Sequence, residues 1–413
     1  MIRINPDNVI VFDNTLTIYE IRKFGGFVKN LAGDSGPRNI TLDFSGISKA
    51  FPGAMLPLIA NCAALQKRGV SFFVTLPKNQ FSRRLFLNCG WAHALNPEYF
   101  EAPEMRDGDH LPVRRFADAT EQDTIVKDVI AKILRNVPYL ERNALDGFEW
   151  SLIEICDNVI NHSQSQVGGY VQFSPHKTAK EIEFIVSDCG IGIPESLRSI
   201  RNREWSDLTA LQQCVKKGVT RDTAYGQGNG LFGSYRVAEL SGGTFSINSG
   251  FAHLNARDGQ PLESYEDNIV FPGTTVLCRI NYSRPPVLAQ ALHLDAYEFH
   301  SPLENNYLQD CGFLRVRLAD EASSVGSRHA GLEIRNMGTN MMARYAAHGI
   351  VFECSGLGVM SSSFADELFG KLAVSLGVDD YKKKIRISGI SSLNSNIVNM
   401  AVCERLAEAS KNR

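Results

Sequence analysis

A chain of 413 residues is long enough for two to three domains, and its 44% of hydrophobic residues can fill several cores. The formal net charge of −2 and the pI near 6.5 argue against a broad nucleic-acid-binding surface. The nine cysteines form neither a CxxC pair nor a Cys/His cluster, so neither a disulfide framework nor a zinc site is indicated. The start of the sequence lacks the apolar core of a signal peptide, and no run of about 18 apolar residues occurs, which predicts a cytoplasmic protein without a membrane span.

The first region, residues 1–112, alternates strand-like and helix-like segments and predicts a small α/β domain. Residues 98–115 are polar and contain several prolines, which indicates an inter-domain connection and a domain boundary near residue 112. The expected elements are the strand Asn39–Phe44, the helix Ala54–Lys67, the strand Val70–Leu76 and the helix Gln80–Cys89.

The second region, residues 113–285, places helices first and strands later, which predicts an α+β sandwich with helices on one face of a mixed sheet. A polar stretch at residues 250–270 lies between its last two strands and predicts an extended hairpin. The expected elements are the helices Glu121–Val137, Tyr139–Ser163 and Leu231–Leu240 and the strands Gly168–Ser174, Glu181–Ser187, Thr244–Ser249 and Thr275–Ile280.

The third region, residues 300–413, alternates again and predicts a second small α/β domain. The expected elements are the strands Phe313–Leu318, Gly349–Glu353 and Lys384–Ile387 and the helices Ser327–His348, Ser363–Leu376 and Asn394–Ala409.

The helix Tyr139–Ser163 carries an unusual polar face. At about 100° per residue, Glu154, Asn158 and Asn161 fall in one narrow sector, and Asp157 and His162 flank it. Such a face either binds a ligand or is a solvent-exposed surface, and the helix alone does not decide between these interpretations.

Two glycine-containing motifs follow this helix. Asp188 comes at the end of a strand, and Gly190 and Gly192 come next in a turn that lets a ligand approach the backbone. The sequence Gly226-Gln-Gly-Asn-Gly230 then leads directly into a helix, whose free amides suit the phosphates of a nucleotide. A dinucleotide-binding fold is disfavoured, because the glycines follow no strand within a βαβ unit.

The combination and order of these motifs resemble the nucleotide-binding domain of the GHKL ATPase family, which includes gyrase, Hsp90, sensor histidine kinases, MutL and the anti-sigma serine kinases. The resemblance implies the Bergerat α/β sandwich and the cofactors ATP and Mg²⁺. By resemblance, Glu154 is the general base of the reaction, Asn158 binds Mg²⁺ and His162 contacts a phosphate. The resemblance also implies that Asp188 recognises adenine with the help of Thr274 or Thr275, and that Gly190 and Gly192 form the adenine pocket. Gly226, Gly228 and Gly230 would close over the phosphates.

The first and third regions more weakly resemble STAS domains, the small α/β fold of anti-sigma factor antagonists, in which a serine at a helix start is phosphorylated. The third region has Ser361, Ser362 and Ser363 at this place, where they are either phosphoacceptors or caps of the next helix. In the first region the turn from Lys49 to Ala54 has no hydroxyl there, which favours a docking role.

Three functions are compatible with these features. The leading hypothesis is a regulatory switch that binds and slowly hydrolyses Mg·ATP and thereby acts on the flanking STAS-like domains or on a partner. The second is an anti-sigma-type serine/threonine kinase acting on a STAS serine, and the third is a non-catalytic scaffold stabilised by ATP. A sensor histidine kinase is disfavoured, because neither helix before Trp150 contains a histidine. A bacterial signalling role, a STAS-domain or other signalling protein as partner, and an ATP-dependent homodimer are further expectations.

Overall fold

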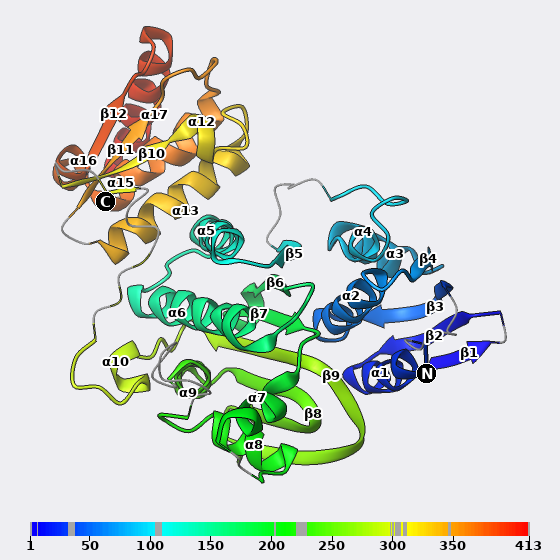
Figure 1. Cartoon of the computed structure of the whole chain (residues 1–413). Coiled ribbons are helices and arrows are strands. Elements are labelled where there is room, and N and C mark those ends of the chain that lie inside the picture. The colour runs from blue at the N-terminus through cyan, green and yellow to red at the C-terminus, as the bar shows by residue number, and fades with distance from the viewer. Residues whose placement is uncertain are drawn as a thin grey trace. The chain divides into compact units, whose positions relative to one another are not determined.

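The structure is a computed structural model with a mixed α+β architecture (Figure 1). The chain divides into two compact units, one formed by residues 1–126 and 146–299 and the other by residues 127–145 and 300–413. Among the described helices, none combines the length and the hydropathy that a membrane span requires. The described residues are 2–5, 7–31, 38–103, 110–201, 204–219, 229–297, 299, 301, 307–308, 312–345 and 348–411.

The first unit begins with a four-stranded sheet in the order β1-β2-β3-β4. The β1–β2 pair is antiparallel, whereas β2, β3 and β4 are parallel because helices α1 and α2 form the crossovers between them. The elements of this part are β1 (Ile2–Asn5), β2 (Val9–Leu16), α1 (Ile18–Leu31), β3 (Asn39–Ala50), α2 (Pro52–Gln66), β4 (Ser71–Thr75), α3 (Gln80–Asn88) and α4 (Trp91–Leu95).

The same unit contains a five-stranded sheet in the order β5-β6-β7-β9-β8. Every pair in this sheet is antiparallel, so the prediction of a mixed sheet is wrong. Short turns join β6 to β7 and β8 to β9, whereas helices lie in the connections between β5 and β6 and between β7 and β8. Its elements are β5 (Leu111–Phe116), α5 (Ala119–Asn136), α6 (Arg142–Asn158), the π-helical turn η1 (Val159–Ser163), β6 (Gly169–His176), the 3₁₀ turn η2 (Lys177–Ala179), β7 (Glu181–Asp188), α7 (Gly192–Arg201), α8 (Asp207–Cys214), α9 (Gly230–Ser241), β8 (Thr244–Arg257), β9 (Glu263–Asn281) and α10 (Leu288–Ala291).

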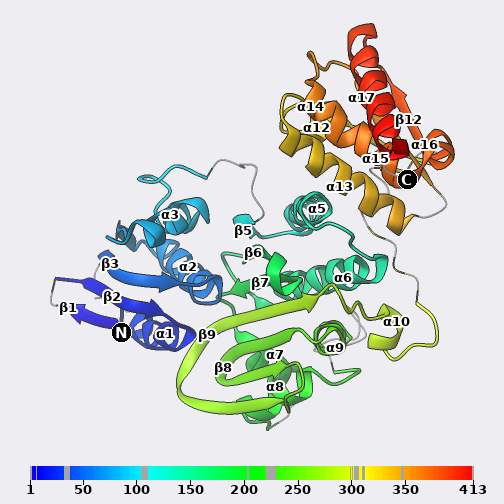
Figure 2. The same ribbon diagram turned by 180° about the vertical axis from the view of Figure 1, so that it is seen from behind.

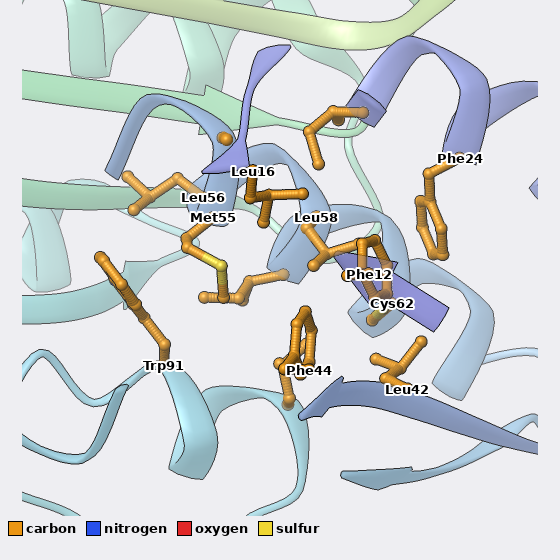
Figure 3. Close-up of a cluster of buried hydrophobic side chains, with 14 of the residues drawn as sticks. Phe12, Leu16, Phe24, Leu42, Phe44, Met55, Leu56, Leu58, Cys62 and Trp91 are labelled. Carbon is orange, nitrogen blue, oxygen red and sulfur yellow. The ribbon is translucent and has the colours of Figure 1, made fainter. Parts of the chain in front are cut away.

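Helix α2 lies between the two sheets (Figures 1 and 2). Pro52 at its first turn suits a helix start, and the helix that follows is apolar on all sides, which is the pattern of a helix with no solvent-facing side. On one side Met55, Leu58 and Cys62 pack among the aromatic residues of the first sheet (Figure 3). On the other side the same cluster continues into β6 and β7 of the second sheet, so the two sheets share one core across α2.

Successive residues of β7 point to opposite faces of the five-stranded sheet. Ile185 joins the core around α2, whereas Phe184 packs edge-on against Phe148 of α6, with ring centroids 5.1 Å apart. Asp188 lies on the same face as Phe184, since it is four residues further along the strand. One face is therefore covered by α2, and the other carries the polar helix α6.

Arg22 of α1 connects the N-terminal part to the long β8–β9 hairpin. Its side chain is buried, and its guanidinium stacks on Phe271 at 5.4 Å from the ring centroid. It donates hydrogen bonds at 2.9–3.3 Å to the side-chain oxygen of Asn248 and to the carbonyl groups of Gly250, Ala252 and Ile269. The hairpin is extended as the sequence predicts, with its root held by one buried cation.

Arg22→Met is expected to destabilise the first unit by about 2–4 kcal/mol, because it keeps the apolar stem but leaves buried carbonyl acceptors without donors. The free energy of unfolding, measured with urea, checks this. Lys23→Met is the matched control, since Lys23 is the adjacent, partly exposed cation that lies over the ring of Tyr19. Equal stability of the two variants would contradict the assigned role of Arg22.

The second unit contains a three-stranded parallel sheet in the order β10-β11-β12. The elements of this unit are β10 (Phe313–Arg317), α12 (Leu318–Glu321), α13 (Arg328–Arg344), β11 (Gly349–Glu353), α14 (Ser362–Ala365), the π-helical turn η3 (Asp366–Gly370), α15 (Lys371–Leu376), α16 (Val378–Lys384), β12 (Ile385–Ser388) and α17 (Ser392–Lys411), together with residues 127–145 of α5 and α6.

Asn340 of α13 is buried and fixes the turn between α5 and α6. Its side-chain amide donates hydrogen bonds to the carbonyls of Leu134 and Val137, and its side-chain oxygen accepts one from the backbone amide of Leu140.

Candidate nucleotide site

Helix α6 presents its polar face to a cavity of about 430 Å³ in the first unit. The face arises because Leu152 and Cys156 are buried on the other side of the helix. All five polar residues predicted for this face line the cavity, namely Glu154, Asp157, Asn158, Asn161 and His162.

The end of α6 is not a regular α-helix. From Val159 to Ser163 the chain makes a π-helical turn, which changes the angular position of Asn161 and His162 relative to the spacing assumed from the sequence. Ser163 is buried, and its hydroxyl donates to the carbonyl of Val159 at 2.7 Å. Both polar residues still reach the cavity, so the π-turn adjusts this end of the site without removing them.

Asp188 enters the cavity from the opposite wall, at the end of β7. It is buried, and its Oδ1 accepts a hydrogen bond from the amide of Gly190 at 2.7 Å. Burial raises the pKa of Asp188 to about 7, although backbone hydrogen bonds from Gly190 and Thr274 act in the other direction. A buried acid that accepts hydrogen bonds from backbone amides is suited to accept one more from a neutral donor group of a ligand.

Ser249 organises the backbone around Asp188. Its hydroxyl accepts from the amide of Ile193 at 2.9 Å, donates to the carbonyl of Gly273 at 2.9 Å and lies 3.0 Å from the hydroxyl of Thr274. Thr274 is opposite Asp188 in the β7–β9 pair and lines the cavity. This set fixes the position of a second polar group beside the carboxyl.

The structure places the two alternative threonines, Thr274 and Thr275, on different faces of the sheet. As the next residue of the strand, Thr275 points to the other face of the sheet, where its hydroxyl lies 2.7 Å from that of Ser187. Of the two adjacent threonines, only Thr274 lines the cavity.

Glu154 lies one helical turn before Asn158 on α6, and two effects act on its carboxyl. Burial, and to a lesser extent the nearby Asp157, raise the pKa of Glu154 to about 7. Asp157 itself accepts a hydrogen bond from Gln122 at 2.8 Å, which gives it a structural partner. Glu154 is therefore a carboxylate of raised basicity, suited to accept a proton.

The first turn of α9 approaches α6 closely at Gly230. A Cβ atom at Gly230 would lie 2.6 Å from Oε2 of Glu154 and 3.6 Å from Nδ2 of Asn158, so a side chain here would displace the carboxyl. The amide nitrogen of Asn158 is buried and has no hydrogen-bond partner in the part of the chain that the structure describes. The start of α9 and the unpartnered amide of Asn158 both offer N–H donors here, an arrangement that fits a bound anion, with the Glu154 carboxyl beside it.

The remaining predicted glycines have different positions. A Cβ at Gly190 would lie 2.0 Å from the carbonyl oxygen of Ser163, so this glycine is required by the backbone of η1 and does not line the cavity. Gly192 lines the cavity and has a φ of +80°. Gly226 and Gly228 lie outside the described residues.

A family model described as histidine kinase-, DNA gyrase B- and HSP90-like ATPase matches residues 146–282, the segment that supplies most of this cavity. This segment is a GHKL-type domain. A second model, a STAS-like domain of unknown function, matches residues 343–394 in the second unit.

Two further comparisons complete this picture. The ATPase region of Saccharomyces cerevisiae topoisomerase II bound to ICRF-187 (dexrazoxane) is similar at 13% identity over 37% of this chain and 40% of that chain, with a TM-score of 0.19. The chain thus spans less than half of that structure. Among curated proteins, none matches this chain.

A GHKL domain implies ATP binding, usually with Mg²⁺, and the residues of the cavity fit both. The buried amide of Asn158 can donate to a phosphate oxygen or, with its two ends exchanged, offer an oxygen to a cation. No group of three His, Cys, Asp or Glu side chains that could hold a metal occurs among the described residues. Mg²⁺ is often held by one or two protein oxygens together with phosphates and water.

The serines of the STAS-like domain lie in the second unit and outside this cavity. Ser361 caps α14 by accepting from the amide of Phe364 at 3.1 Å, and its hydroxyl lies 3.1 Å from that of Ser363. Ser362 is exposed at the first turn of the helix. The capping interpretation thus describes Ser361, whereas Ser362 is the accessible hydroxyl.

Several residues that line the cavity were not anticipated from the sequence. Trp150 comes four residues before Glu154, and helical spacing alone could have placed it on the same face. Ser249 does not line the cavity but holds the backbone beside it, and it carries no local motif that reveals this role. Leu292, Leu294 and Tyr297 lie beyond the GHKL match, and no sequence signal indicated them.

Proposed function

We propose that this protein is a regulatory ATPase that binds Mg·ATP in its GHKL domain, hydrolyses it slowly and uses the bound nucleotide to act on its STAS-like parts or on a partner protein. The observation that carries the proposal is the joint position of Glu154, Asn158 and Asp188 around one cavity, with the first turn of α9 opposite Glu154. These groups supply a base, a phosphate- or metal-binding amide and a base-reading carboxyl.

The roles follow from the environment of each group. Asp188 would accept a hydrogen bond from the exocyclic amine of adenine, because its buried carboxyl has an oxygen that can accept from such a donor. Asn158 would bind the phosphate end, where a bound Mg²⁺ neutralises phosphate charge. Glu154 would accept a proton from a water or hydroxyl aligned with the γ-phosphate, and its raised pKa makes it a stronger base than an exposed glutamate.

The test is incubation of the full chain with Mg·[γ-³²P]ATP while free phosphate and protein-bound label are followed separately. We expect free phosphate to be released at well below about 1 s⁻¹, the lower end of common enzyme turnover, with no label on the protein. Nucleotide binding without any phosphate release would favour the ATP-stabilised scaffold instead, and absence of binding would refute the proposal.

A serine kinase is the second candidate, and the exposure of Ser362 is the observation that favours it. In this case label would accumulate on the protein or on an added STAS partner. Ser362→Ala would remove self-labelling, whereas Ser375→Ala, a change in another exposed serine of the same domain, would not. Ser361 is unsuitable for this comparison, because its loss would also remove a helix cap.

The partner is part of the proposal. A STAS-domain protein or another signalling protein would be the target of the switch, and an ATP-dependent homodimer is the further assembly that we propose. Sedimentation with and without Mg·ATP tests the dimer directly.

A further inference from the structure

The segment from Val287 to Tyr297, here called the connector, follows the last strand of the GHKL domain. It lies outside the family match, which ends at residue 282, and the chain runs on from it into the second unit. Leu292, Leu294 and Tyr297 nevertheless line the same cavity as Glu154. Part of the wall of the candidate nucleotide site therefore comes from outside the GHKL domain.

Leu292 lies where α6 and α9 approach each other. A Cβ atom at Gly233 would lie 2.3 Å from the ring of Trp150 and 2.6 Å from the side chain of Leu292. One turn earlier in α9, Gly230 makes the equivalent close approach to Glu154. Leu292 thus packs at the Trp150 turn of α6, next to the turn that carries the predicted base.

The connector also contacts the elements on both sides of the site. His293 accepts, through its carbonyl, a hydrogen bond of 3.0 Å from Nζ of Lys217, just after the end of α8. The ring of His293 packs edge-on against Phe232 in the first turn of α9, with centroids 5.1 Å apart. Leu292 between these contacts is only 3% exposed. The connector therefore bridges α6, α9 and the end of α8 at one place.

We propose that the connector is a wall of the nucleotide site and that Leu292 is a positioning residue, which sets the spacing between Glu154 and the first turn of α9. This inference rests on the proposed function, since it assigns a further part of the same site. Phosphate groups held between α6 and α9 need a fixed spacing, and small displacements of such groups weaken binding and catalysis strongly. The connector leads into the unit that contains the STAS-like domain. Nucleotide bound against the connector therefore restrains the motion of the segment that joins the two units.

The experiment compares Leu292→Ala with Leu288→Ala in the full chain. Leu288 is a matched control, since it is a leucine of the same connector, 5% exposed, that does not line the cavity. By calorimetry, Leu292→Ala should raise the Kd for Mg·ATP by about tenfold or more, whereas Leu288→Ala should leave it within about twofold. Leu292→Met, which restores volume, should recover most of the affinity.

Hydrogen exchange of the wild-type chain gives an independent measurement. Amide exchange in the peptide covering residues 288–297 should slow when Mg·ATP is added. Equal affinities of Leu292→Ala and Leu288→Ala, or no change in connector exchange although ATP binds, would overturn the inference and leave the proposed function intact. A wild-type chain that binds no ATP would refute both.

Discussion

Asp188→Asn is expected to weaken ATP binding strongly and, at the same time, to stabilise the protein without nucleotide. The asparagine oxygen can still accept from Gly190, but its amide adds a donor where the adenine amine must also donate. Two facing donors should weaken binding by on the order of 100-fold or more. Calorimetric titration with Mg·ATP checks the loss.

The gain in stability follows from the raised pKa of Asp188, about 7 in the folded chain against a usual value of 3.8. Between these values the folded protein holds a proton that the unfolded chain releases, so the free energy of unfolding falls as pH rises through this window. The full loss in wild type is roughly 4 kcal/mol, at one pKa unit per 1.36 kcal/mol. Asparagine cannot ionise and avoids this cost.

Urea unfolding without nucleotide at several pH values tests this part. The advantage of Asp188→Asn over wild type should grow between pH 5 and pH 7 and stay constant above about pH 8. Asp43→Asn serves as a control at a half-buried strand aspartate that lies outside the cavity. A constant difference between wild type and Asp188→Asn at all pH values would show that Asp188 is not the titrating group.

Glu154→Gln is expected to separate binding from turnover. The change keeps the size of the side chain and its place beside Gly230 but removes the base, so ATP should bind within about threefold of wild type while kcat falls by about 10²–10⁴-fold. Phosphate release at saturating Mg·ATP and an independent Kd give the two quantities.

Asp157→Asn is the matched control for Glu154→Gln. It removes the same charge from the same polar face, and the asparagine oxygen can still accept from Gln122. Its kcat should stay within about tenfold of wild type, because Asp157 is assigned no proton transfer. If Asp157→Asn lost as much activity as Glu154→Gln, the base would have to be reassigned or shared between the two residues.

The parts of the site that could be predicted are those written in local sequence. Helical spacing placed Glu154 and Asn158 on one face, and a strand followed by glycines placed Asp188 at a turn, since both patterns depend only on neighbours along the chain. The three strands and the helices α13 and α17 of the third region were predicted close to their observed bounds, whereas the short helices α12 and α16 were not, and the helix expected at Ser363–Leu376 is interrupted by the π-helical turn η3.

Other features depend on contacts that the sequence does not display. The strand period of two separates Thr274 from Thr275, but only the packed sheet shows which face meets the cavity. The first strands and α1 were missed, since their short segments form through pairing with β3 and packing on α2. The position of Leu292 against Trp150 likewise requires the chain to fold back from beyond the GHKL domain.

The burial of α2 between two sheets has a practical consequence for how this protein can be divided. A fragment trimmed to the family match at residues 146–282 would lose α2 and leave Tyr170 and Ile185, now in the shared core, facing water. An apolar sheet face uncovered in this way is a surface for aggregation. We therefore expect the GHKL domain to fold only together with the N-terminal residues that cover this sheet face. Activity measurements should use a chain that includes them.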